Sequence, residues 1–358
     1  MAEAGLEHPL CGATLPALAG VVHRAPRVPA RSWPWLAYFG LCALARSPFT
    51  LAETALEAAT RTPYATPLFI VGHWRSGTTH LVNLLASAER FHAPTPVAVG
   101  LPAERRLLGR PLEPLLARLI PTGRWIDAVA VDRSAPQEDE IALANLGVPS
   151  FYEAYYLPGD LRRRLAALLF LDERATARWL DRADAFYRRL ARERRGARLL
   201  VKNPVYTARV GAILRRWPDA RFIHCVRDPY AVFASTLRFH RELAAALGLA
   251  PFDDAELETA VIETYATMMQ RFEADRGLLG ADRIVDVRYE DLTARPLDEL
   301  ARIYATLDLG DFAADRPAFA AHLEAVAGYR AGRYRLDDAT RARLDAAWGP
   351  FVARWGVA

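Results

Sequence analysis

The clearest structural signal in the chain comes from Leu68-Phe-Ile-Val-Gly72-His-Trp-Arg-Ser-Gly77-Thr-Thr-His-Leu81. Its first four residues form a short apolar run, which is typical of a buried strand. Gly72 and Gly77 enclose a turn, and a helical pattern of apolar residues follows through Ala88. The stretch therefore predicts a strand that passes through a tight turn into a helix, whose N-terminus favours negative charge.

The two glycines of this turn have the spacing of a P-loop, G-x-x-x-x-G-K-[ST], with Thr78 in the place of the lysine. The backbone N–H groups of such a loop surround a phosphate. The missing lysine would contact the β- and γ-phosphates of ATP, so an ordinary ATPase or kinase is disfavoured. Arg75 instead offers a planar guanidinium suited to one terminal phosphate or sulfate group. A glycine turn without a ligand is the ordinary alternative.

Three further apolar runs have the length of buried strands: Leu199–Lys202, Arg221–Val226 and Arg283–Arg288. Long stretches with helical spacing lie between the strands, such as 162–195 and 257–279. Strands that alternate with helices predict an α/β fold with a central parallel β-sheet flanked by helices. We expect residues 1–66 to form a helical N-terminal extension, and residues 67–358 to form one α/β domain with helical insertions.

The chain contains one lysine, Lys202, and its other basic residues are 45 arginines. Lys202 ends the second candidate strand, and open α/β sheets bind ligands at the carboxyl ends of their strands. A lysine there is expected to contact an anion; chance survival is the alternative. The third strand ends at Arg227, followed by Asp228 as an expected N-cap and Pro229 as an expected first helical residue. Ser235 follows in that helix, so Arg227 and Ser235 are candidates for holding a further phosphate.

In this order, the motifs resemble those of the sulfotransferases, which use 3′-phosphoadenosine 5′-phosphosulfate (PAPS) as donor. The motifs that carry the resemblance are the Arg75-Ser-Gly-Thr-Thr79 loop, Lys202-Asn-Pro204, Val226-Arg-Asp-Pro229 with Ser235, and Tyr289-Glu-Asp-Leu292. The likeness covers roughly residues 66–310 and is greatest to the bacterial and protein-tyrosine-type branches. It implies a P-loop-like fold and sulfotransferase activity.

The resemblance also implies a role for each matching residue. The loop that would hold the 5′-phosphosulfate of the donor consists of Arg75, Ser76, Gly77, Thr78 and Thr79. Lys202 matches the lysine beside the bridging oxygen, where it would stabilise the leaving phosphate. Arg227 and Ser235 match the pair that binds the 3′-phosphate and so selects PAPS over ATP. Tyr289 matches a residue near the adenine.

The chain departs from the cytosolic sulfotransferases in two ways. Arg75 stands where the cytosolic members have a lysine, as it does in the protein-tyrosine-type enzymes. The C-terminal glycine-rich phosphate loop of the cytosolic branch is missing, and Arg330 and Arg333 are the candidates to replace it. An exposed basic turn is the alternative for these two arginines.

Sulfuryl transfer should resemble phosphoryl transfer, in which positioning and charge stabilisation lower the barrier. The loop arginine and the lone lysine supply positive charge, so we expect no metal. A base must deprotonate the acceptor hydroxyl. The resemblance to sulfotransferases with a carboxylate base favours Glu138 or Glu140, in an acidic cluster expected to open a helix at Pro136. His80 is the alternative base.

The composition of the chain excludes or disfavours several other classes of protein. The 358 residues are 52% hydrophobic with a formal net charge of +4, which excludes a disordered chain and suits an anionic ligand. Three widely spaced cysteines give neither a disulfide framework nor a zinc site, so a cytoplasmic location is expected. Arginines that lie beside acids along helices disfavour nucleic-acid binding.

The run Trp33–Ala45 is strongly apolar but too short to cross a bilayer, which needs about 20 apolar residues. A buried helix with Arg31 and Arg46 at its ends is the favoured interpretation. Peripheral membrane contact through residues 33–45 is the alternative, since Trp33 and its neighbouring aromatics suit an interface.

The sequence therefore predicts a PAPS-dependent sulfotransferase that acts on a hydroxyl of a small-molecule or lipid-like acceptor. A P-loop nucleotide kinase and a non-catalytic protein that binds adenosine 3′,5′-bisphosphate are the alternatives. A sensor of the bisphosphate would need the 3′-phosphate pair but no cation at a leaving oxygen, so Lys202 favours the enzyme. The identity of the acceptor and the oligomeric state are not predicted.

Overall fold

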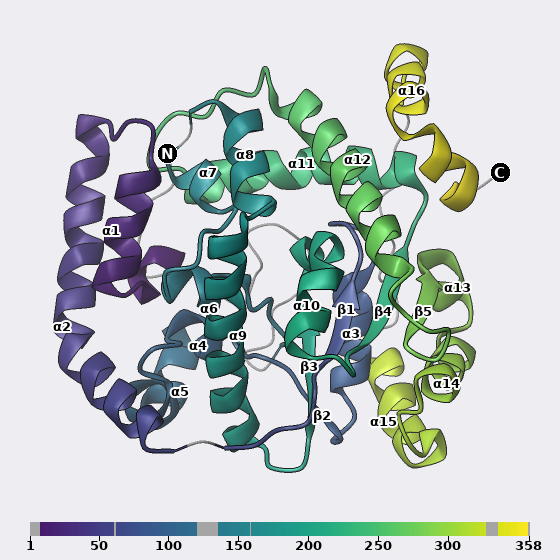
Figure 1. Ribbon diagram of the computed structural model, residues 1–358, viewed down its shortest axis with the longest axis horizontal. Helices are drawn as coiled ribbons and strands as arrows, with labels where there is room; N and C mark the ends of the chain where they lie inside the picture. The colour runs from purple at the N-terminus through teal and green to yellow at the C-terminus, as the bar shows by residue number, and fades with distance from the viewer. Residues whose placement is uncertain (1–7, 61, 120–134, 158, 327–335, 357–358) are drawn as a thin grey trace. The chain divides into compact units, whose positions relative to one another are not determined.

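The computed structural model describes residues 8–60, 62–119, 135–157, 159–326 and 336–356 (Figure 1). The chain divides into two compact units. The first, here called the helical unit, consists of Met1–Tyr64, Pro94–Arg195 and Phe239–Ala260. The second, here called the sheet unit, consists of Ala65–Ala93, Gly196–Arg238 and Val261–Ala358.

The sheet unit contains a five-stranded sheet in the order β2-β3-β1-β4-β5, and all neighbouring strands are parallel. The strands are β1 (Leu68–Val71), β2 (Phe91–His92), β3 (Arg198–Lys202), β4 (Arg221–Val226) and β5 (Ile284–Arg288). The predicted α/β fold with a central parallel sheet is confirmed, and the four predicted strands are present to within one residue at each end. The short edge strand β2 was not predicted, because two residues carry no periodic pattern.

Helices cover both faces of this sheet, as the alternation of side chains along β1 requires. Leu68 and Ile70 belong to one apolar core together with residues of α3 (Thr78–Ala86), α14 (Pro296–Leu307) and α15 (Phe312–Ala325). Phe69 points to the other face, where its ring packs against those of Tyr206 and Trp217. The remaining helices of the sheet unit are a 3₁₀ helix at Pro204–Arg209, α10 (Val210–Arg216), α13 (Tyr289–Ala294) and α16 (Asp338–Trp355).

Register brings the carboxyl ends of the central strands to one edge. Ile70 of β1 pairs with Lys202 of β3 on one side and with Ile223 of β4 on the other. The loop after β1, the end of β3 and the end of β4 therefore lie at the same edge of the sheet. This edge is where open α/β sheets bind their ligands.

The helical unit contains most of the other helices (Figure 1). They are short 3₁₀ helices at Pro9–Gly12 and Ala30–Ser32, a π-helical turn at Arg105–Gly109, and α1 (Leu15–Arg24), α2 (Trp33–Ala58), α4 (Pro96–Gly100), α5 (Arg110–Leu119), α6 (Glu140–Asn145), α7 (Glu153–Tyr156), α8 (Leu161–Leu169) and α9 (Glu173–Glu193). The predicted helical stretch 162–195 is split by Asp172, whose side chain caps α9 by accepting the N–H of Ala175 at 2.7 Å. Two further helices cross unit boundaries in the sequence, α11 (Pro229–Leu247) and α12 (Leu257–Arg276).

Two local predictions were wrong. The acidic cluster does not open a helix at Pro136: α6 begins only at Glu140, because the backbone before it is diverted and the N–H of Gln137 donates to the carbonyl of Pro94 at 2.8 Å. Residues 33–45 are not a short buried helix between two arginines. They form the first half of the 26-residue α2, in which Arg46 lies inside the helix and Leu41 is 66% exposed.

Candidate active site

The loop after β1 folds into a tight, strained turn. Gly72 and Gly77 have positive φ values of 138° and 98°, and Arg75 has a φ of 69°, which is costly for a residue with a side chain. A Cβ atom at Gly72 would lie 2.5 Å from the carbonyl oxygen of Cys225 in β4. The glycine at position 72 therefore permits a close approach of two strand ends that no other residue would allow.

Hydrogen bonds hold this turn in place. The N–H and Oγ of Ser76 both donate to the carbonyl of His73, at 3.2 and 2.7 Å. The N–H of Gly72 donates to Oγ1 of the fully buried Thr207 at 2.8 Å. The first helical residue after the turn is Thr78, so the turn delivers the N-terminus of α3 directly to the sheet edge. The first N–H groups of a helix have no partner within it and attract an anion.

Lys202 stands at the carboxyl end of β3, as predicted. Lys202 is only 4% exposed, and its Nζ lies 3.4 Å from Oγ1 of Thr79 in the first turn of α3. A buried ammonium group beside a helix N-terminus is a strongly positive site. The predicted phosphate loop and the lone lysine are thus brought together.

Three of the other predicted residues are joined through Arg75. The Nε of Arg75 donates to Oγ of Ser235 at 2.8 Å, and Nη1 of Arg227 donates to the carbonyl of Arg75 at 3.2 Å. The guanidinium of Arg227 lies 4.5 Å from the centre of the Tyr289 ring. Tyr289 in turn packs against Gly77, where a Cβ would come within 2.5 Å of the tyrosine Cδ2. The loop, the end of β4 and the start of α13 therefore form one connected group.

Burial favours the neutral forms of two histidines and one cysteine near this group. Burial lowers the pKa of His73 to about 4, against a smaller opposing effect of the Trp74 carbonyl. Burial and the charge of His322 lower the pKa of His80, the alternative base. Burial raises the pKa of the Cys225 thiol, although the Lys202 ammonium opposes the change. The positive charge of the site therefore comes from arginine and lysine.

The two predicted carboxylate bases belong to the helical unit. Glu138 is half-buried in the segment before α6, and Glu140 is 2% exposed as the first residue of that helix. Asp139 between them is fully buried and accepts the Tyr187 hydroxyl at 2.6 Å. Burial raises the pKa of Tyr156, and the charges of Glu153 and Glu140 raise it further.

The described residues do not include every predicted site residue. Arg330 and Arg333 lie outside the described residues. Among the described residues, no group of three or more histidine, cysteine, aspartate or glutamate side chains is arranged to hold a metal ion. Thr207, which fixes the N–H of Gly72, was not predicted, because nothing in Lys202-Asn-Pro-Val-Tyr-Thr207 distinguishes its hydroxyl from any other.

Comparison with known proteins identifies the family of this chain. The model of the sulfotransferase family matches residues 67–313. Curated relatives in Mycobacterium bovis and Mycobacterium tuberculosis are 34% identical over 299 residues, which is 81% of this chain and 75% of theirs. Both relatives are named omega-hydroxy-beta-dihydromenaquinone-9 sulfotransferase Stf3.

Two solved structures share the fold. The sulfotransferase STF9 from Mycobacterium avium has a TM-score of 0.73 at 18% identity, over 95% of this chain and 90% of that protein. The sulfotransferase STF1 from Mycobacterium tuberculosis has a TM-score of 0.66 at 18% identity, over 92% and 90% of the two chains.

Proposed function

The chain belongs to the sulfotransferase family, and we propose that it transfers the sulfuryl group of PAPS to a hydroxyl group of a lipid-like acceptor. One observation carries the proposal for the donor. A glycine-bounded loop, a helix N-terminus, a buried lysine and two linked arginines meet at the carboxyl edge of one parallel sheet. This arrangement suits a ligand with two separate anionic groups.

The residues present fit the two ends of PAPS. The loop Arg75–Thr79 and the start of α3 would hold the 5′-phosphosulfate, and Arg227 with Ser235 would hold the 3′-phosphate. The hydrogen bond from Arg75 to Ser235 supports one continuous donor site, because it joins residues assigned to the two anionic groups. Tyr289, on which Arg227 rests, would border the adenine.

The transfer would form one bond and break one. The acceptor oxygen attacks sulfur, the bond from sulfur to the bridging oxygen breaks, and adenosine 3′,5′-bisphosphate leaves. Lys202 would stabilise the charge on the bridging oxygen, where a compact ammonium acts at a single point. The acceptor proton passes to a base, which the proposal assigns to the pair Glu138 and Glu140.

The acceptor class rests on the named relatives. Stf3 is named for a hydroxylated menaquinone derivative, and this chain is 34% identical to it over 81% of its own length. A hydroxyl on a lipid-like molecule is therefore the acceptor that we propose for this chain. When the protein is incubated with [³⁵S]PAPS and vesicles that contain a hydroxylated isoprenoid quinol, we expect it to produce labelled lipid.

Thermal stabilisation tests the donor site without an acceptor. A ligand at about one hundred times its Kd adds about 2.7 kcal/mol of stability, so adenosine 3′,5′-bisphosphate should raise the midpoint clearly. ATP with magnesium and AMP should shift it little. A shift with ATP and magnesium alone would reject the PAPS assignment and favour the nucleotide kinase.

Two measurements refine the chemistry. The variants Glu138→Gln and Glu140→Gln should separate the two candidate bases, since only loss of the base should abolish the acidic limb of the pH profile of turnover. Turnover that survives both changes would exclude a base in this pair. Because protein cations supply the positive charge, treatment with EDTA should leave turnover unchanged, and a loss restored by magnesium would overturn the proposal of metal-independent transfer.

A further inference from the structure

Helix α2 exposes large apolar side chains along its whole length. Leu51 is 72% exposed, Leu41 is 66% exposed and Leu44 is 59% exposed. The large apolar residues on this exposed side, here called the outer face of α2, are Trp33, Leu41, Leu44, Phe49, Leu51 and Leu56. Single exposed apolar residues are ordinary, but six on one helix are typical of a surface that binds another apolar phase.

The charged residues of α2 all lie on its opposite side. Arg46, Glu53 and Glu57 are the three charged residues of the helix, and their spacing of seven and four residues keeps them on one face. Glu53 is completely buried and accepts the N–H groups of Arg106 and Leu107. This orientation is the reverse of an ordinary surface helix, which turns its charges to water.

The inward charges have specific partners within the helical unit. Nη1 of Arg46 donates to Glu104 at 2.9 Å, and its Nη2 donates to the carbonyls of Cys11 and Ala13. Glu57 accepts Nη1 of Arg192 at 2.5 Å. Because these partners fix the rotation of the helix about its axis, the outer face cannot turn inward without breaking them.

Arginines lie at both ends of the outer face. Arg27 and Arg31 are exposed just before α2, and Arg106 and Arg110 are exposed in and after the turn that Glu53 holds. None of the four forms an ion pair with any residue that the structure describes. Cations beside an apolar helix face attract the anionic head groups of a membrane surface.

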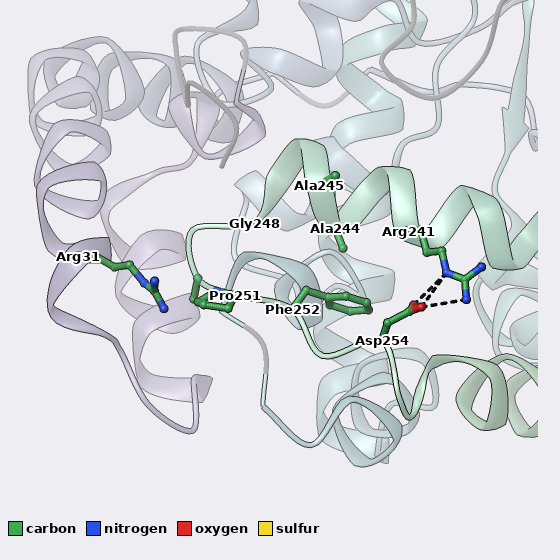
Figure 2. A pocket seen from close by; sticks show the side chains of 9 residues that line it. Arg31, Arg241, Ala244, Ala245, Gly248, Pro251, Phe252 and Asp254 are labelled. Carbon is green, nitrogen blue, oxygen red and sulfur yellow. Dashed lines mark hydrogen bonds and ion pairs between the residues drawn. The ribbon is translucent and has the colours of Figure 1, made fainter.

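An apolar pocket adjoins the N-terminal end of α2. It has a volume of about 490 Å³, and its wall includes Ala244, Pro251 and Phe252. Figure 2 shows Arg31 at one end of this wall, while Arg241 at the other end is paired with Asp254. Ser32 ties α2 to the pocket by donating to the carbonyl of Leu249 at 2.8 Å. An apolar wall beside an unpaired arginine suits a lipid with an anionic head group.

We propose that the outer face of α2 docks the protein on an anionic lipid bilayer, with the helix lying in the plane of the interface. No described helix is long and apolar enough to cross a membrane, which agrees with a helix that lies on the surface. Leucine and tryptophan side chains enter the boundary of the acyl chains, and the four arginines contact phosphates.

A second copy of the chain is a less suitable occupant of this face. In a two-fold dimer, each outer face meets itself, so arginines at one or the other end of α2 would face arginines of the second copy. Like charges across an interface disfavour association, whereas an anionic bilayer attracts all four. The charge pattern therefore favours the membrane.

Co-sedimentation with vesicles tests the proposal on the full chain. The vesicles are phosphatidylcholine alone, or phosphatidylcholine with about a third phosphatidylglycerol. We expect the protein to pellet with the anionic vesicles, and added salt to weaken the binding. The variant Leu41→Glu/Leu44→Glu/Leu51→Glu should bind at least tenfold more weakly. Replacing both Arg27 and Arg31 by Ala should weaken binding roughly 25-fold, from about fivefold for each arginine.

A matched control separates the docking face from general surface charge. Leu278 is 61% exposed in the sheet unit, and Leu278→Glu should bind anionic vesicles as the unchanged protein does. Each variant must keep the thermal midpoint of the unchanged chain, which excludes loss of folding as the cause.

Three outcomes would overturn the proposal. They are no binding to anionic vesicles, unchanged binding of the triple glutamate variant, or a dimer in analytical ultracentrifugation that this variant abolishes, which would make a second copy the occupant. The assay contains neither donor nor acceptor, so its result is independent of the proposed sulfuryl transfer.

Discussion

The loop after β1 and helix α2 use charge in opposite ways. The loop gathers cations at a sheet edge, where Lys202 is buried and Arg75 is held by Ser235. Helix α2 places its three charges against the protein and four of its five leucines toward the surroundings. The first arrangement suits a small anion that replaces water, and the second suits an extended apolar phase.

This contrast shows how each region could change independently. The loop depends on a few atoms placed within tenths of an ångström, so one substitution should remove its function. The outer face of α2 depends on summed apolar area and charge, so single substitutions there should act weakly and additively. The following experiments test that difference, beginning with the largest expected effect.

The change Lys202→Ala should lower turnover about 10³-fold, because it removes the cation assigned to the leaving oxygen. Vesicle binding through α2 should not change. Sulfuryl transfer from labelled PAPS, measured beside co-sedimentation, gives both values. Retention of turnover within tenfold would remove Lys202 from the proposed mechanism, and Lys202→Arg shows whether the charge alone suffices.

Acid should destabilise both regions through buried histidines. Burial lowers the pKa of His73 in the loop and of His8, which stacks on Phe39 of α2, each to about 4. The unfolded chain protonates them near the ordinary pKa of about 6.5. Stability is therefore complete above that pH and falls as pH drops toward 4, by up to about 3 kcal/mol for each histidine.

Urea unfolding between pH 7 and 4.5 measures this loss. His73→Gln, in the sheet unit, should make the free energy of unfolding depend less on pH. His8→Gln, in the helical unit, should do the same. If neither variant changes the slope, the two histidines are not protonated on unfolding in this range. If the free energy of unfolding has nearly the same slope against pH in both variants, the two regions are equally sensitive to acid.

Gly77→Ala should weaken binding of adenosine 3′,5′-bisphosphate at least tenfold and lower stability by about 2 kcal/mol. The new methyl group would lie 2.5 Å from Tyr289, in addition to the strain of a positive φ. Gly196 is the matched control, because it also has a positive φ, of 86°, but open space around its Cβ position. Gly196→Ala should cost about 1 kcal/mol and leave binding intact, as isothermal titration can show.

Ser235→Ala should have the smallest effect, about fivefold in affinity for the bisphosphate. It removes one hydrogen bond to Arg75, worth about 1 kcal/mol. Ser87→Ala removes a similar bond, to the Leu84 carbonyl at the end of α3, and should not change affinity. If the two variants bind the bisphosphate with equal affinity, the assignment of Ser235 to the 3′-phosphate is wrong.

The fold was predictable because its signals are local and strong. The four central strands are short apolar runs between turn residues, and the loop glycines have a fixed spacing. The edge strand β2 was not predictable, since its pairing with β3 depends on the rest of the sheet.

The site could be predicted in part. The meeting of Lys202, Arg227 and the loop at one edge of the sheet was predictable, because strand ends mark ligand positions in α/β sheets. The hydrogen bond of Thr207 to Gly72 and the contact of Tyr289 with Gly77 could not be found, because they join segments far apart in the sequence. The burial of residues 33–45 was predicted wrongly, because an apolar run shows which residues share a face but not which side faces water.

The burial of Lys202 leaves the exterior of the protein without lysine amines. Apart from the α-amino group, any amine-directed reagent can therefore react only at the candidate donor site. Reductive methylation with ¹³C-formaldehyde would place one side-chain label in the molecule, and a single NMR signal would report its surroundings. Protection of that amine by adenosine 3′,5′-bisphosphate would then give a chemical footprint of the donor at one residue.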